Sequence, residues 1–176
     1  MGRLGRRTSS HHGDTEDTKT ARRSSERTIG AAIEVHRHLG PGLLESSYHS
    51  CLCRELELRG IAYQSKTPLP LQYKGIEIAR GYILDLLIDN ALIIEIKSVE
   101  RLLPIHSSQL VTYMRLRKVQ AGLLINFNVG FLSAAFEEFY YETTPPFGFR
   151  VLRASVLTAS VTPEPTPEHL SRAAPP

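Results

Sequence analysis

The chain has 176 residues, of which 41% are hydrophobic and 22% are charged, values typical of one globular domain with short tails. No apolar run approaches the roughly 18–20 residues of a membrane span, so we expect no membrane-spanning segment. The arginines near the start are not followed by an apolar segment, so we expect no secretory signal. The net charge of +3 permits contact with nucleic acid but does not by itself indicate it.

The two ends of the chain are poor in the aliphatic residues that a core needs. Residues 1–25 are rich in Arg, Ser, Thr, Gly and His, and the end of the chain is rich in Pro. Such segments bury too little apolar surface to offset the entropy lost on ordering. We therefore predict one domain at 26–142 between a disordered tail at 1–25 and a largely disordered tail at 143–176.

An apolar period of 3.6 residues predicts helices on both sides of a block of strands. The first helix is closed by Gly40 and Pro41, the second stops at Gly60, and the third has Pro104 in its first turn, where proline is favoured. The segment FLSAAFEEFYYE is predicted to form a last helix. The predicted helices span residues 27–40, 42–59, 104–119 and 131–142.

The segment 61–98 changes to a period typical of strands. Its β-branched and aromatic residues are interrupted by turn signals at Lys74-Gly75 and Asp89-Asn90, which predicts three or four antiparallel strands. The later segment AGLLINF is apolar except for Asn126, as expected of a strand buried on both faces. These elements predict an α/β fold in which a mixed central sheet with antiparallel hairpins is flanked by helices.

The two cysteines, Cys51 and Cys53, lie two residues apart in a predicted helix. That spacing is poor for a disulfide, and a zinc site would need further Cys or His ligands nearby. We expect both thiols to be reduced and structural, which is typical of a cytoplasmic protein.

Two opposite charges, Glu95 and Lys97, interrupt an otherwise aliphatic strand. Residues two apart in a strand project from the same face. If the preceding loop has three residues, Asp85 of the neighbouring strand lies opposite Glu95 on that face. If the loop has two residues, Asp85 opposes Ile94 and faces the other way. We predict a loop of odd length or a bulge, which brings the two carboxylates together.

Two nearby carboxylates repel each other, and burial adds the cost of removing them from water. Lys97 cannot neutralise both, whereas Mg²⁺ (or Mn²⁺) binds carboxylate oxygens together with water and phosphate. Lys97 would then hold a scissile phosphate or orient a water molecule beside the metal. The alternative from pattern alone is a cross-strand ion pair on a solvated face.

The arrangement of Asp85, Glu95 and Lys97 across a hairpin resembles the PD-(D/E)xK nuclease superfamily, although Leu84 stands where that name has its proline. The segment EVHRHLGPGLLESSYHSCL is similar to the signature of the GxxExxY family, which is assigned to the same superfamily. The downstream segments SSQLVTYMRL and GLLINF also fit, and the resemblance covers about residues 28–132.

The GxxExxY signature corresponds to Gly42, Glu45 and Tyr48. The resemblance implies a restriction-endonuclease-like core and an Mg²⁺-dependent nuclease site, with Glu45 as a metal ligand beside Asp85 and Glu95. Glu45 could instead only complement its helix dipole, Glu34 is a weaker rival as a ligand, and Tyr48 could simply pack.

The resemblance also places Gln109 in the expected helix, where it would bind Lys97 or a phosphate; the alternative is an exposed helix residue. His36 falls on an apolar helix face, as expected of a hydrogen-bonded core histidine.

The sequence thus predicts a cytoplasmic, Mg²⁺-dependent nuclease that acts on DNA or RNA. A catalytically silent module on the same fold is the alternative, binding nucleic acid or a protein through Arg115, Arg117 and Lys118. A homodimer in which the partner completes the site is a further alternative.

Overall fold

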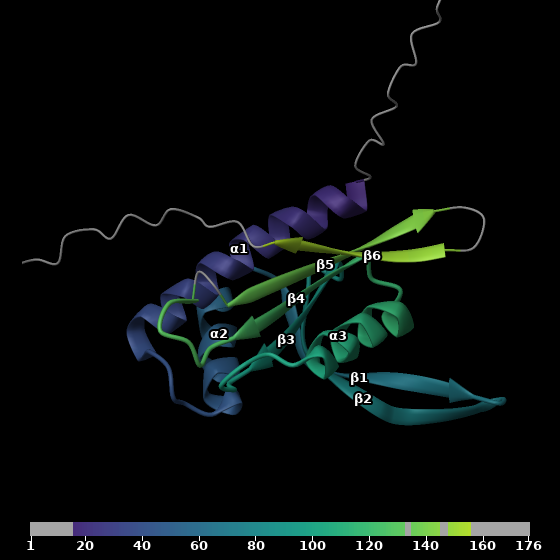
Figure 1. Ribbon diagram of the computed structural model, residues 1–176, viewed down its shortest axis with the longest axis horizontal. Coiled ribbons are helices and arrows are strands. Elements are labelled where there is room, and N and C mark those ends of the chain that lie inside the picture. The colour runs from purple at the N-terminus through teal and green to yellow at the C-terminus, as the bar shows by residue number, and fades with distance from the viewer. Residues whose placement is uncertain (1–15, 133–134, 145–147, 156–176) are drawn as a thin grey trace, which may run out of the picture.

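The computed structural model describes residues 16–132, 135–144 and 148–155. Its six strands form one sheet in the order β1-β2-β3-β4-β5-β6 (Figure 1). The helices are α1 (Glu16–Leu39), α2 (Glu45–Leu58) and α3 (Pro104–Arg117), and the strands are β1 (Tyr63–Tyr73), β2 (Ile76–Ile88), β3 (Leu92–Lys97), β4 (Ala121–Asn126), β5 (Phe136–Thr144) and β6 (Gly148–Ser155).

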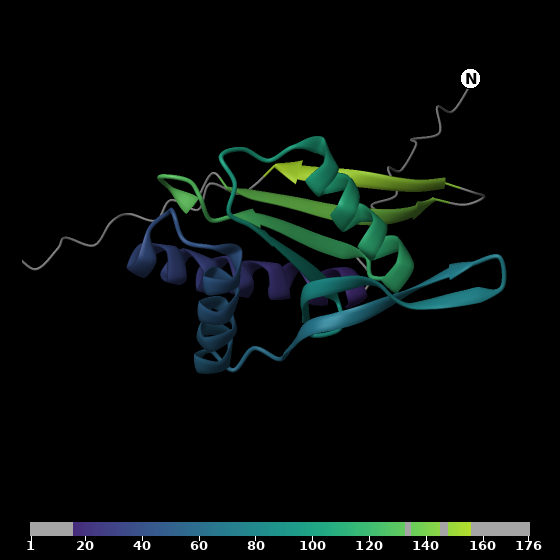
Figure 2. The same ribbon diagram turned by 90° about the horizontal axis from the view of Figure 1, so that it is seen from below.

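Helices α1 and α2 cover one face of the sheet, and α3 covers the other (Figures 1 and 2). Strands β3 and β4 are parallel because α3 connects them as a crossover, and the other neighbouring strands are antiparallel. The predicted α/β fold with a mixed, helix-flanked sheet is therefore confirmed. No helix within the described residues has the length and apolar content needed to cross a membrane.

The core lies in two apolar layers, one on each face of the central strands. Ile94 of β3 packs in the layer under α1 and α2, and Ile93 packs in the layer under α3. Every residue of β4 is buried, as predicted for a strand covered on both faces. The β1–β2 hairpin, by contrast, extends beyond the rest of the sheet (Figures 1 and 2).

Helix α1 begins at Glu16, so residues 16–25 are helical, contrary to the prediction of a disordered tail up to residue 25. Two of its small polar side chains are buried with partners: Ser24 Oγ donates to Asp89 Oδ2 at 2.6 Å, and Ser25 Oγ donates to Glu138. A helical segment poor in large aliphatic residues can pack when its buried hydroxyls are hydrogen-bonded in this way. The rest of that predicted tail, residues 1–15, lies outside the described residues.

The helix predicted at 131–142 is wrong, because residues Phe136–Thr144 form strand β5. Phe136 and Phe139 have a helix-like spacing of three, but they are buried in opposite core layers. Strand β6 pairs with β5 and lies within residues 143–176, which were predicted to be largely disordered. Residues 156–176 of that predicted tail lie outside the described residues.

Candidate functional site

Next to its turn, the β2–β3 hairpin has the register predicted from its loop length. Leu86 pairs with Ile94, and the turn between the strands has three residues, 89–91, two of which have positive φ of 49° and 54°. The loop of odd length is confirmed. The pairing ends at Leu86–Ile94, and the alternation of faces breaks at Asp85, because Leu84 and Leu87 both pack in the layer under α3. The prediction that Asp85 lies opposite Glu95 on the same face is therefore wrong.

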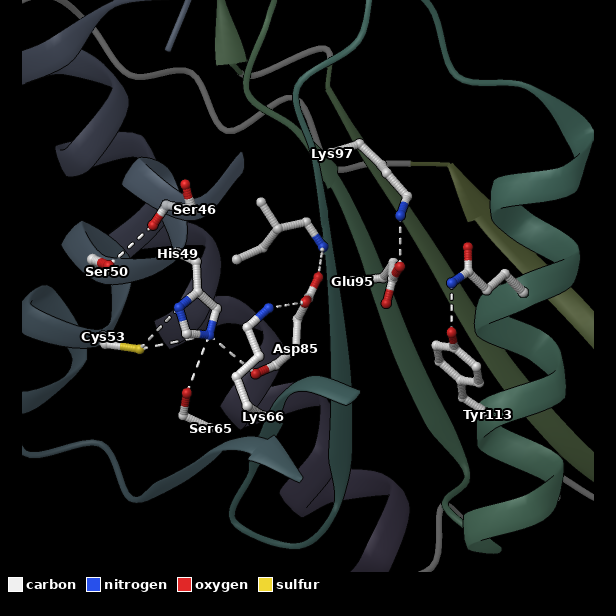
Figure 3. Close-up of polar contacts among 12 residues, drawn as sticks. Ser46, His49, Ser50, Cys53, Ser65, Lys66, Asp85, Glu95, Lys97 and Tyr113 are labelled. Atoms are coloured by element: carbon white, nitrogen blue, oxygen red, sulfur yellow. Dashed lines mark hydrogen bonds and ion pairs between the residues drawn. The ribbon is translucent and has the colours of Figure 1, made fainter. Parts of the chain in front are cut away.

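The two carboxylates make separate contacts. Asp85 Oδ2 accepts a hydrogen bond from the Ile96 amide at 2.9 Å, and its Oδ1 lies 2.6 Å from Lys66 Nζ. Glu95 Oε1 lies 2.6 Å from Lys97 Nζ. In Figure 3 the Asp85–Lys66 pair lies on the α2 side of β3, and the Glu95–Lys97 pair lies on the α3 side. The end of the hairpin therefore carries two adjacent ion pairs in place of one acid–acid–lysine group.

Glu95 is the most buried carboxylate of the site, with 3% of its surface exposed. Its Oε2 atom is buried and has no hydrogen-bond partner among the described residues. Burial and then the negative charge of Asp85 raise the pKa of Glu95 to about 7, although Lys97 opposes the shift. An ionised Glu95 thus has an unsatisfied oxygen that a cation would stabilise.

Lys97 keeps its positive charge beside this acid. Burial lowers the pKa of Lys97, but the hydrogen bond to Glu95 and the charges of Glu95, Glu45 and Asp85 outweigh that effect and raise the pKa above its ordinary value. The ammonium group is therefore charged at neutral pH and can act on a phosphate anion.

The raised pKa of Glu95 makes the metal-free protein less stable as the pH rises. Between the unfolded value of 4.5 and the folded value of about 7 the folded state retains a proton that the unfolded state releases. Relative to Glu95→Gln, we expect the free energy of unfolding to fall between pH 4.5 and 7.5, by on the order of 3 kcal/mol. Urea denaturation in EDTA at several pH values measures this difference, and parallel pH profiles would contradict it.

Glu45 is the first residue of α2 and is tied to the end of β3. Its Oε1 accepts from the amide of Ser98, the residue after β3, at 3.2 Å. Ser98 Oγ in turn donates to the carbonyl of Leu43 at 2.6 Å. These two bonds hold the beginning of α2 against the strand that carries the Glu95–Lys97 pair.

Tyr48 packs in the core and also shapes the loop before Glu45. Its ring is fully buried and stacks on Phe127 with centroids 4.5 Å apart. Its hydroxyl donates to the Gly40 carbonyl at 2.6 Å and accepts from the Leu43 amide at 3.2 Å. The interpretation of Tyr48 as a packing residue is confirmed. Its hydroxyl also positions the loop between α1 and α2.

We expect Tyr48→Phe to lower the free energy of unfolding by about 1 kcal/mol, because both loop groups lose their partner while the ring packing is kept. Urea denaturation measures the change. Tyr73→Phe, at an exposed ring of the β1–β2 hairpin, is the control and should change stability by less than about 0.5 kcal/mol. Equal losses in the two variants would show that the loop bonds do not stabilise the fold.

A cavity of about 550 Å³ opens on the α2 side of the site. Asp85 and Glu45 line it, together with two residues that the sequence analysis missed, Lys66 and His49. The cavity is lined by Leu43, Leu44, Glu45, Ser46, His49, Lys66, Asp85, Ile96 and Ser98.

His49 could have been found from its spacing, because it lies four residues after Glu45 and so on the same helix face. Its Nε2 lies 3.2 Å from the Asp85 carbonyl and 3.2 Å from Ser65 Oγ. Lys66 gave no local signal, since it approaches Asp85 only when β1 pairs with β2.

The remaining predicted residues, Gln109 and Glu34, are bonded within their own helices. Gln109 Nε2 donates to the Tyr113 hydroxyl, so in this structure the amide is directed to its own helix. Glu34 is bonded to Arg37 and His38 within α1.

Two structural interpretations are confirmed. His36 Nε2 lies 2.8 Å from the Val129 carbonyl, so it is a hydrogen-bonded core histidine. Cys51 and Cys53 are free thiols.

The donor set fits a hard divalent cation. Carboxylate oxygens are the ligands that Mg²⁺ and Mn²⁺ prefer, and Glu95 Oε2 is a buried oxygen without a partner. Among the described residues, no three His, Cys, Asp or Glu side chains are already gathered into a metal-binding group. A bound cation would therefore have to compete with the lysines that now hold the acids.

The sheet, its helical layers and the acid–lysine pairs on β2 and β3 define a domain of the restriction-endonuclease-like class. A scan against protein-family models matches residues 22–139 to the PD-(D/E)XK nuclease superfamily. The match covers more than half of the chain, and the chain belongs to this superfamily. No curated protein and no solved structure matched the chain significantly.

Proposed function

We propose that this protein is a nuclease that hydrolyses the phosphodiester bonds of nucleic acid with the help of Mg²⁺ or Mn²⁺. The observation that carries the proposal is the buried Glu95, whose free oxygen lies beside the charged Lys97 in a chain of the PD-(D/E)XK superfamily. Within the superfamily we assign the chain to the GxxExxY family, on Gly42, Glu45 and Tyr48.

In this proposal Asp85 and Glu95 bind the metal ion, and Glu45 assists from the beginning of α2. Such an ion, when bound, activates water and neutralises charge on the phosphate. Glu45 suits this role because its bond to Ser98 keeps it beside the end of β3. Without a cation the carboxylates repel one another, as the raised pKa of Glu95 indicates. A bound cation would remove this electrostatic repulsion.

Lys97 binds a non-bridging phosphate oxygen or positions the attacking water. Its ammonium group is fixed by Glu95 on one side and is largely shielded from solvent. Its attraction to the phosphate therefore becomes stronger as negative charge develops on the phosphate oxygens. Gln109 supports Lys97 from α3, after its amide turns from the Tyr113 hydroxyl that it now contacts. The substrate is DNA or RNA.

A catalytically silent binding module is the second candidate. It is favoured by two observations. Asp85 and Glu95 are already paired with lysines, and the described residues contain no ready-made group of three metal ligands. Such a module would use the exposed basic residues at the end of α3, Arg115, Arg117 and Lys118.

Cleavage assays separate the two candidates. The full chain is incubated with plasmid DNA, single-stranded DNA and RNA in Mg²⁺, in Mn²⁺ and in EDTA. A nuclease cleaves at least one substrate with metal and none in EDTA. Absence of cleavage by folded protein in every condition would overturn the proposal. Salt-dependent binding of nucleic acid that Asp85→Ala leaves unchanged would then favour the module.

We further propose a cytoplasmic location, on the free thiols of Cys51 and Cys53. A homodimer whose partner completes the site is the alternative assembly, and light scattering with and without Mg²⁺ tests it.

A further inference from the structure

Lys66 has an unusual backbone for a strand residue. Its φ is 49°, a region that residues other than glycine rarely adopt. Its neighbours pair regularly, Ser65 with Leu86 and Thr67 with Leu84, so Lys66 lies opposite Asp85. Strained conformations of this kind persist only where the surroundings hold them, and they are frequent at functional sites.

The side chain of Lys66 is placed to exchange partners. Its Nζ lies 2.6 Å from Asp85 Oδ1, yet 55% of the Lys66 side chain is exposed, against 18% for Asp85. A lysine has a long stem with several rotatable bonds, so the ammonium can leave one oxygen for another nearby without a change in the backbone. Lys66 also lines the cavity, together with Glu45 and Ser98. Its side chain lies across from α2 (Figure 3).

The net charge of the site favours such an exchange of partners by Lys66. With all groups ionised, the carboxylates of Glu45, Asp85 and Glu95 and the ammonium groups of Lys66 and Lys97 leave one net negative charge. A divalent cation turns this into one net positive charge, which a single phosphodiester neutralises. Without Lys66 the metal-loaded site would be neutral and would become negative with substrate.

We propose that Lys66 is a phosphate-binding residue contributed by the β1–β2 hairpin, which neutralises Asp85 until a metal ion replaces it and then binds the nucleic acid backbone. This inference rests on the proposed nuclease function. It predicts opposite effects of one substitution: removing the ammonium group strengthens metal binding and weakens nucleic acid binding. A lysine with a purely structural role would weaken both or change neither.

The metal arm of the test is calorimetric titration of the full chain with Mg²⁺ alone. Lys66→Gly removes the charge and suits the positive φ, so it should fold. We expect its Kd for Mg²⁺ to fall about tenfold, because one competing and repelling cation is gone. Lys66→Arg keeps the charge and should stay within about threefold of the wild-type protein.

Lys74→Gly is the matched control. Lys74 is also a lysine with positive φ, 45°, but it lies in the turn of the hairpin and does not line the cavity. This variant should leave the Mg²⁺ affinity within about twofold of wild type, since an exposed distant charge is screened by salt.

The nucleic acid arm is fluorescence anisotropy with a labelled DNA duplex, with Ca²⁺, which prefers the same oxygen ligands, replacing Mg²⁺. We expect Lys66→Gly to raise the Kd for the duplex about tenfold and to make its salt dependence shallower by about 0.9 in slope, the value for one lost phosphate contact.

The outcomes separate the two proposals. A wild-type chain that binds no Mg²⁺, or that binds neither the DNA duplex nor an RNA of the same sequence, would overturn the proposed function, and the role of Lys66 with it. A wild-type chain that binds Mg²⁺ and one of these nucleic acids, with Lys66→Gly showing unchanged or weaker Mg²⁺ affinity or unchanged affinity for that nucleic acid, would overturn the role of Lys66 alone.

Discussion

Replacing Lys97 by methionine is expected to lower kcat for nucleic acid cleavage by about 100- to 1000-fold, the usual loss when one group that stabilises transition-state charge is removed. Methionine keeps an apolar side chain of similar length and removes the ammonium group. Glu95 then loses its partner, but its pKa is already raised to about 7, so it can take up a proton and avoid an isolated buried charge. The fold should therefore survive.

Single-turnover cleavage with saturating Mg²⁺ measures this effect, and thermal unfolding checks that the variant is folded. Lys19→Met is the control, because Lys19 lies on α1 in an exposed pair with Glu16. It should cleave at the wild-type rate. If folded Lys97→Met retained full activity, Lys97 would have no catalytic role.

Replacing Asp85 by asparagine is expected to weaken Mg²⁺ binding by about 100-fold, because a charged ligand oxygen is lost while the side-chain shape is kept. The asparagine carbonyl can still accept the hydrogen bond from the Ile96 amide, so the end of the hairpin should keep its geometry. The substitution also removes a charge that raises the pKa of Glu95, so that pKa should fall. Calorimetric titration with Mg²⁺ measures the first effect.

Asp89→Asn is the matched control on the same hairpin. Asp89 accepts from Ser24 on α1 and does not line the cavity, so its loss should affect stability but not Mg²⁺ affinity. An Asp85→Asn variant that binds Mg²⁺ as tightly as the wild-type chain would exclude Asp85 as a ligand.

Local signals in the sequence predicted the elements around the site. Pro104 marked the beginning of α3, and the segment 121–127, apolar except for Asn126, indicated the buried strand β4. The register next to the turn could also be predicted, because a loop of three residues sets the Leu86–Ile94 pair through a short-range geometric rule.

Local signals misled where the partner of a segment lies far away in the chain. Phe136 and Phe139 have the spacing of a helix face, but pairing with β4 places them on opposite faces of the sheet. The beginning of α1 was missed because Ser24 and Ser25 are held by acids far along the chain. Local secondary-structure propensity predicts a segment poorly when such tertiary contacts decide whether it forms a helix or a strand.

By itself the sequence determined the helix-flanked mixed sheet, the odd loop and the strands that carry Asp85, Glu95 and Lys97, because period and turn length are local properties. Only the tertiary structure decided which cation each acid contacts. The direction of the Asp85 side chain depends on neighbours from other elements, the Ile96 amide and Lys66. That is why two separate ion pairs, and a lysine from β1, could be found only once the strands were paired.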